Sequence, residues 1–213
     1  MRAAGAAAET DLQRRIHALE RELAVAIEEK ERHFGAAWAS GKMHFTAEVT
    51  AAQRRLKVSL PRYLLDSNLL VALSAPLIYA GFVPFVLLDI FLWVYQGICF
   101  PLYGIPKARR CDYLVFDRGQ LKYLNLLERF NCLYCSYGNG LGAFLVEVAG
   151  RTEQHWCPIK HAKRLRAPHS RYGHFLDYGD AAAYRQQIDR VRFDFVDLRE
   201  LTPEAPELRR DRQ

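Results

Sequence analysis

Residues 64–105 read LLDSNLLVALSAPLIYAGFVPFVLLDIFLWVYQGICFPLYGI, and this stretch decides the fold. From Leu69 to Ile105 the only charged side chain is Asp89, whereas both flanks are rich in charge. A helix that spans a bilayer needs about 20 apolar residues, so a run of this length is enough for two helices. The sequence therefore predicts an integral membrane protein that is anchored by one apolar hairpin, at residues 61–106.

The predicted hairpin turns at Gly81–Pro84, because glycine interrupts helices and proline is favoured at the first position of a new one. Its two arms are Leu64–Ala80 and Pro84–Ile105. Basic residues flank both arms: Arg54, Arg55, Lys57 and Arg62 precede them, and Lys107, Arg109 and Arg110 follow. The positive-inside rule then places both flanks and both termini in the cytoplasm. A re-entrant loop satisfies the same rule, and a buried core hairpin of a soluble protein is the alternative.

Asp89 is costly to place in a bilayer, so it needs a partner or water. Two interpretations are open: Asp89 lies on an ion or proton route, or it lies near the far interface within reach of water. We favour the second.

The composition of the 213-residue chain indicates which classes of binding partner are expected. The formal net charge is +6 and the sequence pI is about 9.1, which fits attraction to anionic lipid headgroups. Basic and aromatic residues do not alternate along one face, so no nucleic-acid partner is expected. Five cysteines without a secretory leader indicate a reducing compartment rather than a disulfide framework.

The region 1–60 is predicted to form amphipathic helices. Five apolar residues follow the spacing of a coiled-coil seam: Leu12, Ile16, Leu19, Leu23 and Ala26. Phe34 and Trp38 continue the stripe, Ser40-Gly41 interrupts it, and Phe45 begins a second helical run that ends near Leu56. Two interpretations stay open: a coiled coil for self-association or partner binding, and a helical hairpin packed within the same protein.

Residues 107–176 are predicted to form a cytoplasmic helical domain that carries cysteine and histidine. Cys132 and Cys135 form a C-x2-C pair, and Cys157 and His161 form a C-x3-H pair after a 21-residue spacer. Pro158 is expected to open a helix, which would put Cys157 and His161 on one face. Three thiolates and one imidazole suit tetrahedral zinc, so the predicted zinc ligands are Cys132, Cys135, Cys157 and His161. His155 competes for the fourth place.

Other chemistries use the same residues. An iron or iron–sulfur centre is one, because the ligand set resembles that of the NEET proteins, although the first pair and the spacer differ. A redox-active thiol pair is another, and cysteines that serve only as small core residues are a third. A diiron site is disfavoured, because the Glu-x-x-His pairs that it needs are absent.

Two motifs, NCLYC at 131–135 and RTEQHWCPIKH at 151–161, give residues 111–165 a resemblance to a group of uncharacterised bacterial membrane proteins. The resemblance implies a bacterial inner-membrane setting and no particular reaction.

The C-terminal part is predicted to carry a basic cluster, a short helix and an extended arm. The cluster, which suits an anionic membrane surface or a solvated face, comprises Lys160, Lys163, Arg164, Arg166 and Arg171. Within residues 177–201, Asp180 is expected to cap a helix over Ala181–Ile188, and Val191–Phe195 to form a strand. Residues 202–213 are expected to be disordered.

These features predict a mainly α-helical, membrane-anchored protein. Its expected function is that of a non-enzymatic scaffold or accessory subunit, stabilised by the Cys3His metal site. It would bind a membrane-protein partner or self-associate through its N-terminal helices. The alternative is a membrane-associated redox protein that holds iron or an iron–sulfur cluster.

Overall fold

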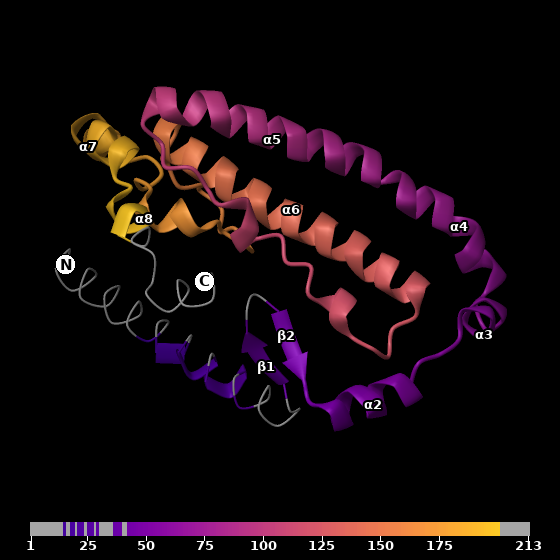
Figure 1. The fold of residues 1–213 in the computed structure, drawn as a ribbon. Coiled ribbons are helices and arrows are strands. Elements are labelled where there is room, and N and C mark those ends of the chain that lie inside the picture. The colour runs from indigo at the N-terminus through magenta and orange to yellow at the C-terminus, as the bar shows by residue number, and fades with distance from the viewer. Residues whose placement is uncertain are drawn as a thin grey trace. The chain divides into compact units, whose positions relative to one another are not determined.

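The computed structural model describes residues 15, 18, 19, 21–23, 25–27, 29, 36–39 and 42–200. The chain divides into two compact units, with the boundary at Lys57–Val58, close to the predicted boundary after residue 60. The described part is mainly helical, which confirms the predicted fold class at that level (Figure 1). The predicted disorder of residues 202–213 lies outside the described residues.

The first unit combines helix with a small sheet. The described residues between 15 and 29 are helical. Strands β1 (Ala36–Ala39) and β2 (Lys42–Phe45) then pair antiparallel, with Trp38 opposite Met43. The prediction that a helical stripe continues through Trp38 is therefore wrong, because aromatic residues around Ser40-Gly41 favour a β-hairpin as readily as a helix. Leu12, Ile16 and Phe34 lie outside the described residues.

The second predicted helical run of this unit is present as α2 (Ala47–Arg55). Thr46 caps it, because its side chain accepts a hydrogen bond from the backbone N–H of Val49 at 3.4 Å.

The apolar stretch forms two helices that continue end to end. After α3 (Leu60–Leu65), the chain forms α4 (Leu69–Ala80) and α5 (Phe82–Tyr103), which follow one line in Figure 1. Gly81 between them keeps right-handed helical angles, with φ −58° and ψ −19°. Pro84 lies in the first turn of α5, where its missing N–H breaks no helical hydrogen bond. The hairpin turn predicted at Gly81–Pro84 is therefore wrong.

Gly81 is needed for close packing rather than for a turn. A Cβ atom at this position would lie 2.3 Å from Oη of Tyr134. That hydroxyl donates a hydrogen bond to the carbonyl of Ile78 at 2.5 Å, at the junction of the two helices. Tyr134, which belongs to the helix that begins at Leu126, thus stabilises the junction.

A 22-residue crossover, residues 104–125, follows α5 and contains two short 3-10 helices, η1 (Arg110–Asp112) and η2 (Arg118–Gln120). Helix α6 (Leu126–Trp156) then begins with a capping box, in which the side chains of Asn125 and Glu128 each bond to the other's backbone N–H. It runs through 31 residues without interruption. Cys157 ends it, and the helix predicted to start at Pro158 is wrong, because residues 157–160 are not helical and Ile159 forms a β-bridge with Leu176.

The glycines of α6 allow a close approach and do not break the helix. A Cβ atom at Gly140 would lie 2.7 Å from the carbonyl oxygen of Tyr113 in the crossover. Gly138-Asn139-Gly140 could equally have broken the helix, but α6 continues through it and only the close approach is observed.

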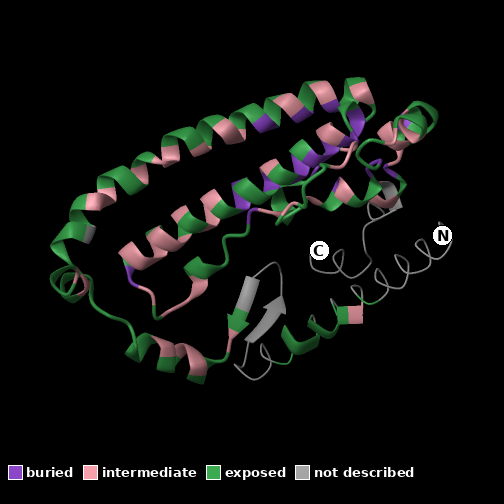
Figure 2. Ribbon diagram, turned by 180° about the vertical axis from the view of Figure 1, so that it is seen from behind, coloured by how far each residue is buried: buried purple, intermediate pink, exposed green. Residues whose placement is uncertain are grey.

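The hydrophobic core lies between α5, α6, the crossover and the C-terminal segment. Its buried members are concentrated on the C-terminal halves of α5 and α6 (Figure 2). They are Leu92, Phe100, Ile105, Ala108, Leu114, Leu141, Phe144, Val148 and Phe195.

The C-terminal segment comprises η3 (Ser170–His174), α7 (Ala181–Phe193) and α8 (Val196–Glu200), and it packs on α6 through η3 and α7. Asp180 caps α7 by accepting from the N–H of Ala183 at 2.9 Å, which confirms its predicted role. The strand predicted over Val191–Phe195 is wrong, because α7 extends to Phe193. Alternating apolar residues over so short a run do not distinguish a strand from the last turn of a helix.

Candidate membrane-binding face

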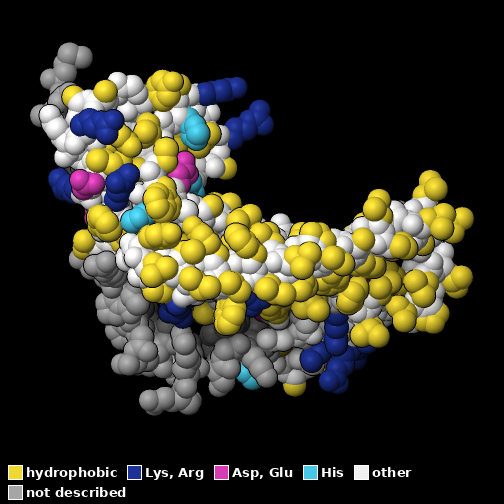
Figure 3. Space-filling model, turned by 90° about the horizontal axis from the view of Figure 1, so that it is seen from above, with side chains coloured by type: hydrophobic (Ala, Val, Ile, Leu, Met, Phe, Trp, Pro, Cys, Tyr) yellow, Lys and Arg dark blue, Asp and Glu magenta, His cyan; other side chains and the backbone are white. Residues whose placement is uncertain are grey.

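Helices α4 and α5 present one continuous apolar face to the outside, which we call the apolar face. Figure 3 looks onto these two helices and shows a nearly unbroken band of hydrophobic side chains. Leu77 is 81% exposed, and Trp93 is 74% exposed. The large members of the face are Leu69, Leu70, Leu73, Leu77, Ile78, Val83, Val86, Leu87, Ile90, Phe91, Trp93, Val94, Ile98 and Leu102.

The length and exposure of this helix distinguish it from a core helix. Residues 72–103 form one 32-residue apolar helix with a mean hydropathy of 2.2 in its best window, long enough to cross a membrane. Only 6% of that window is buried, whereas the core helix of a soluble protein is mostly buried. One helix of the described chain, rather than the two predicted arms, has this character.

Asp89, Tyr95 and Gln96 of α5 lie on its other face, where they find partners. Gln96 is buried and its Oε1 accepts from the backbone N–H of Ala108 at 2.7 Å. The hydroxyls of Tyr95 and Thr152 are 3.1 Å apart. Because these groups are bonded inward, the outward face carries no charged side chain.

Asp89, the one charge in the apolar stretch, is paired within the protein. Its carboxylate accepts two hydrogen bonds from the guanidinium of Arg110, at 2.9 and 2.6 Å, and one from the hydroxyl of Tyr137 at 3.0 Å. The hydrogen bond to Asp89 raises the pKa of Arg110 above its ordinary value. The sequence favours water at a far interface as the surroundings of Asp89, whereas the structure gives it partners within the protein.

The four predicted metal ligands do not meet. Cys132 and Cys135 lie in the first third of α6, and Cys157 caps its other end. Cys135 and Cys157 are 22 positions apart along one helix, which corresponds to about 33 Å. No group of three Cys, His, Asp or Glu side chains in the described residues could hold a metal ion. The predicted site requires the 21-residue spacer to fold back, but the spacer is part of the continuous helix α6.

The individual ligands have ordinary surroundings. Cys132 is half-buried, while Cys135 and Cys157 are exposed. His161 is exposed in the loop after α6, and its backbone N–H donates to the hydroxyl of Tyr172 at 2.8 Å. His155, the competing ligand, is buried against the rings of Tyr103, Trp156 and Phe193.

The motif RTEQHW instead builds a buried polar network that the sequence did not reveal. Gln154 is fully buried and accepts from Nε of Arg171 at 2.6 Å, while its own amide donates to the carbonyl of Asp194 at 2.7 Å. Arg171 also pairs with Asp197 and lies over the ring of Phe195, with its guanidinium carbon 5.5 Å from the ring centroid. The network joins α6 to the C-terminal segment.

A second ion pair lies one turn earlier on α6. Glu147 and Arg151 are both buried and lie 2.7 Å apart. Arg151 also donates to the carbonyl of Pro106 at 2.8 Å, and the hydroxyl of Ser170 donates to Glu147 at 2.7 Å. The i, i+4 spacing of Glu147 and Arg151 in the sequence indicates an ion pair on one helix, but it does not predict that the pair is buried.

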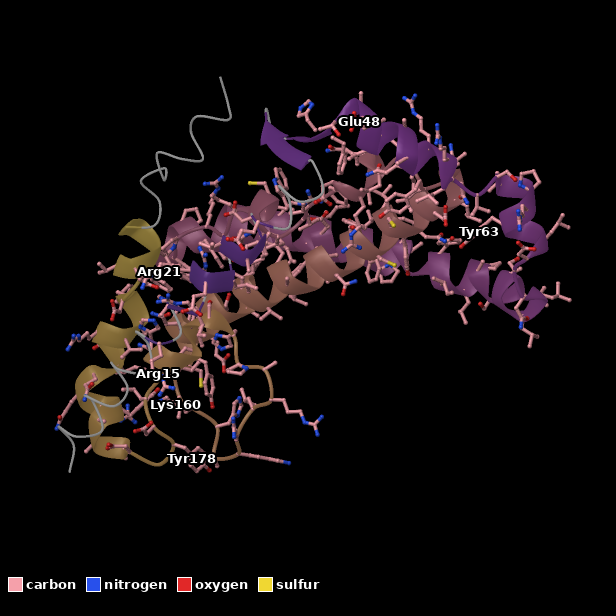
Figure 4. All side chains as sticks on the ribbon, turned by 90° about the horizontal axis from the view of Figure 1, so that it is seen from below. Arg15, Arg21, Glu48, Tyr63, Lys160 and Tyr178 are labelled. Atoms are coloured by element: carbon pink, nitrogen blue, oxygen red, sulfur yellow. The ribbon has the colours of Figure 1, made fainter. Side chains whose placement is uncertain are left out.

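The predicted basic cluster is divided by the fold. Lys163, Arg164 and Arg166 are exposed in the loop after α6. Lys160, labelled in Figure 4, forms an ion pair with Asp177 at 3.0 Å. Arg171 is buried, so it contributes to packing and not to a surface charge.

No family model, no curated protein and no solved structure matches this chain. The apolar face and the contacts around it therefore define the protein as a helical protein with one exposed, membrane-compatible helix.

Proposed function

We propose that the protein is a non-enzymatic scaffold or accessory protein that is held on a lipid bilayer by the apolar face of α4 and α5. The observation that carries this proposal is an apolar helix of 32 residues whose most apolar part is only 6% buried. A contiguous apolar surface of this kind is a liability in water and marks a membrane or protein interaction site. Lipid is the better match, because the large exposed side chains of the face are aliphatic or aromatic and none of them is charged.

Metal binding at the four predicted ligands lacks geometric support, because α6 keeps Cys132 and Cys135 at least about 33 Å from Cys157. The redox alternative depends on the same residues and shares this difficulty. Zinc, iron and iron–sulfur chemistry therefore have no part in the proposed function.

The proposed location is the cytoplasmic face of a bacterial inner membrane. Basic residues flank the apolar helix on both sides, and such residues favour the cytoplasm. With both flanks on one side, the N-terminal unit and the C-terminal segment would be free to bind a membrane-protein partner.

The N-terminal helix supplies the proposed self-association surface. Leu19 and Leu23 share the predicted seam and are exposed by 63% and 62%. Burial of such leucines between two copies would stabilise a dimer or larger assembly.

Co-flotation with vesicles tests the membrane proposal. Leu87→Asp on the apolar face should reduce the partition coefficient at least about thirtyfold, because burial of one leucine contributes about 2 kcal/mol and a carboxylate must also be dehydrated. Leu126→Asp is the matched control, since Leu126 is 73% exposed at the first turn of α6, outside the apolar face. An acidic residue is tolerated there. Equal effects of the two substitutions, or no flotation of the unmodified protein, would refute membrane binding through this face.

A further inference from the structure

Helices α5 and α6 run parallel, so the chain must return between them. The contacts fix the direction. Tyr79, just before α5, bonds to Asn131 near the start of α6. At the other end, the rings of Tyr103 and His155 stack with their centroids 5.3 Å apart.

The crossover, residues 104–125, runs along α6 from its C-terminal end to its N-terminal end. It begins beside the C-terminal end of α6, where Arg151 bonds to the carbonyl of Pro106. It passes the middle of α6 at Gly140 and reaches the start of α6, where Arg129 donates to the carbonyl of Leu121 at 3.3 Å. The crossover therefore spans the distance that α5 spans, in the opposite direction.

The crossover is not suited to hydrocarbon. Of its 22 residues only those of η1 and η2, three residues each, are helical. It carries seven charged side chains: Lys107, Arg109, Arg110, Asp112, Asp117, Arg118 and Lys122. If α5 crossed a bilayer in this fold, the crossover would have to cross back beside it. Irregular, charged backbone does not occur in contact with lipid tails.

We infer that α4 and α5 lie in the plane of one leaflet, with the apolar face in the acyl region and the crossover and α6 on the water side. This inference rests on the proposed membrane function and specifies its geometry. An in-plane helix needs one apolar face and one polar or protein-covered face, which is the distribution along α5. Both flanks then stay on one side without any hairpin.

The partner that this geometry selects is an anionic phospholipid. A groove of about 520 Å³ combines apolar side chains of α5 with cations of the crossover, and it is lined by Trp93, Val94, Ile98, Lys107 and Arg110. Arg110 is occupied by Asp89, whereas Lys107 is exposed at the edge of the apolar face. In the in-plane orientation Lys107 lies at headgroup depth, where it binds a lipid phosphate, and Trp93 lies at the interface that its ring favours.

The depth of three labels tests the orientation. Leu73→Cys, Leu87→Cys and Leu102→Cys each place one cysteine on the apolar face of the full chain, once the five native cysteines are replaced by serine or alanine and the helical content is shown to be unchanged. Each is labelled with an environment-sensitive fluorophore and bound to vesicles of phosphatidylcholine and phosphatidylglycerol that carry nitroxide quenchers at defined depths. The in-plane orientation predicts the same depth for all three labels.

A crossing helix gives a different profile. Leu73 and Leu102 are 29 positions apart, about 44 Å along a helix, so they would lie near opposite headgroup layers while Leu87 lies deep. That profile in bound protein would overturn the in-plane inference and leave membrane binding intact. Failure to bind vesicles would refute the proposed function itself.

The headgroup contact has its own matched pair of variants. Lys107→Gln should weaken binding to vesicles with phosphatidylglycerol about fivefold, the contribution of one lysine at an anionic surface, and leave binding to pure phosphatidylcholine unchanged. Arg190→Gln removes the same charge from the exposed side of α7 and should have no effect on either. An equal loss in the two variants, or no loss in Lys107→Gln, would overturn the assignment of Lys107 to lipid.

Discussion

Buried polar side chains hold the C-terminal segment on α6. Arg171 is only 2% exposed, so its guanidinium cannot rely on water. It donates hydrogen bonds to Gln154, to the carbonyl of Asp194 and to Asp197. Burial by itself would raise the pKa of Asp197, but the hydrogen bond and the charge of Arg171, with the charge of His174 and the backbone of Leu198, together hold that pKa below its ordinary value. A buried charge is tolerated when its hydrogen bonds are satisfied in this way.

His155 should make stability depend on pH. Burial, and then the charge of Arg192, lower the pKa of its imidazole below the ordinary value. The unfolded chain takes up a proton near pH 6.5, while the folded protein resists it. The free energy of unfolding should therefore be largest above about pH 6.5 and decrease as the pH falls toward the folded pKa. Urea unfolding at several pH values measures this dependence.

His155→Phe should remove that part of the pH dependence while it keeps the ring stacking. His161→Phe is the control, because His161 is exposed and also stacks on a tyrosine, Tyr172, at 6.3 Å. If both variants keep the full slope between pH 6.5 and 5, His155 is not its source.

At the scale of elements, α6 is the helix around which the second unit is organised. It contacts α5, η2, η3 and α7. Its small residues let neighbouring backbone approach, and this determines where the crossover lies.

Gly140→Ala and Gly142→Ala should have opposite effects. At Gly140 the new methyl would meet the backbone of Tyr113 at 2.7 Å, so the crossover must shift, at a cost of about 1–3 kcal/mol. At Gly142 nothing lies within 4 Å, so alanine should stabilise the helix by about 0.5–1 kcal/mol. Thermal unfolding compares the two, and a similar loss at both positions would contradict the packing described for the crossover.

The N-terminal helix should mediate self-association. Leu19→Asp should dissociate the assembly, because a carboxylate in a packed seam is costly to dehydrate. Arg21→Gln changes the net charge by the same amount on another face and should leave the assembly intact. Light scattering in detergent gives the mass. An unchanged mass for Leu19→Asp would favour packing within the same chain.

At the scale of the whole molecule, one apolar helix and one charged crossover determine how the second unit can meet a bilayer. The crossover carries its charges back along the full length of α6, so the two features cannot both lie in hydrocarbon. A surface-bound protein satisfies both.

Reporter fusions should confirm that both flanks lie on one side. A reporter placed after Lys57 and one placed after Arg110 should both report the cytoplasm, because neither flank is moved across the membrane. Opposite signals would require α5 to cross, and the contacts of α6 with α5 would then have to be broken in the membrane.

The sequence by itself determined the helical class and the apolar stretch, along with the position of the helix cap at Asp180. These depend on composition and on spacings of a few residues, which local physical chemistry fixes. An apolar run of this length, with Asp89 as its one charged side chain, has to avoid water wherever it lies.

Only the tertiary structure decided where the chain turns. Gly81 and Pro84 are compatible with a hairpin, but Tyr134 packs on Gly81 and the helix continues. Likewise, Cys132, Cys135, Cys157 and His161 have the spacing of a metal site, but α6 stays helical between the pairs, because its glycines receive Phe85 and the crossover instead of breaking the helix. Contacts between residues distant in sequence outweigh a local preference of about 1 kcal/mol for a glycine break, and no local pattern contains those contacts.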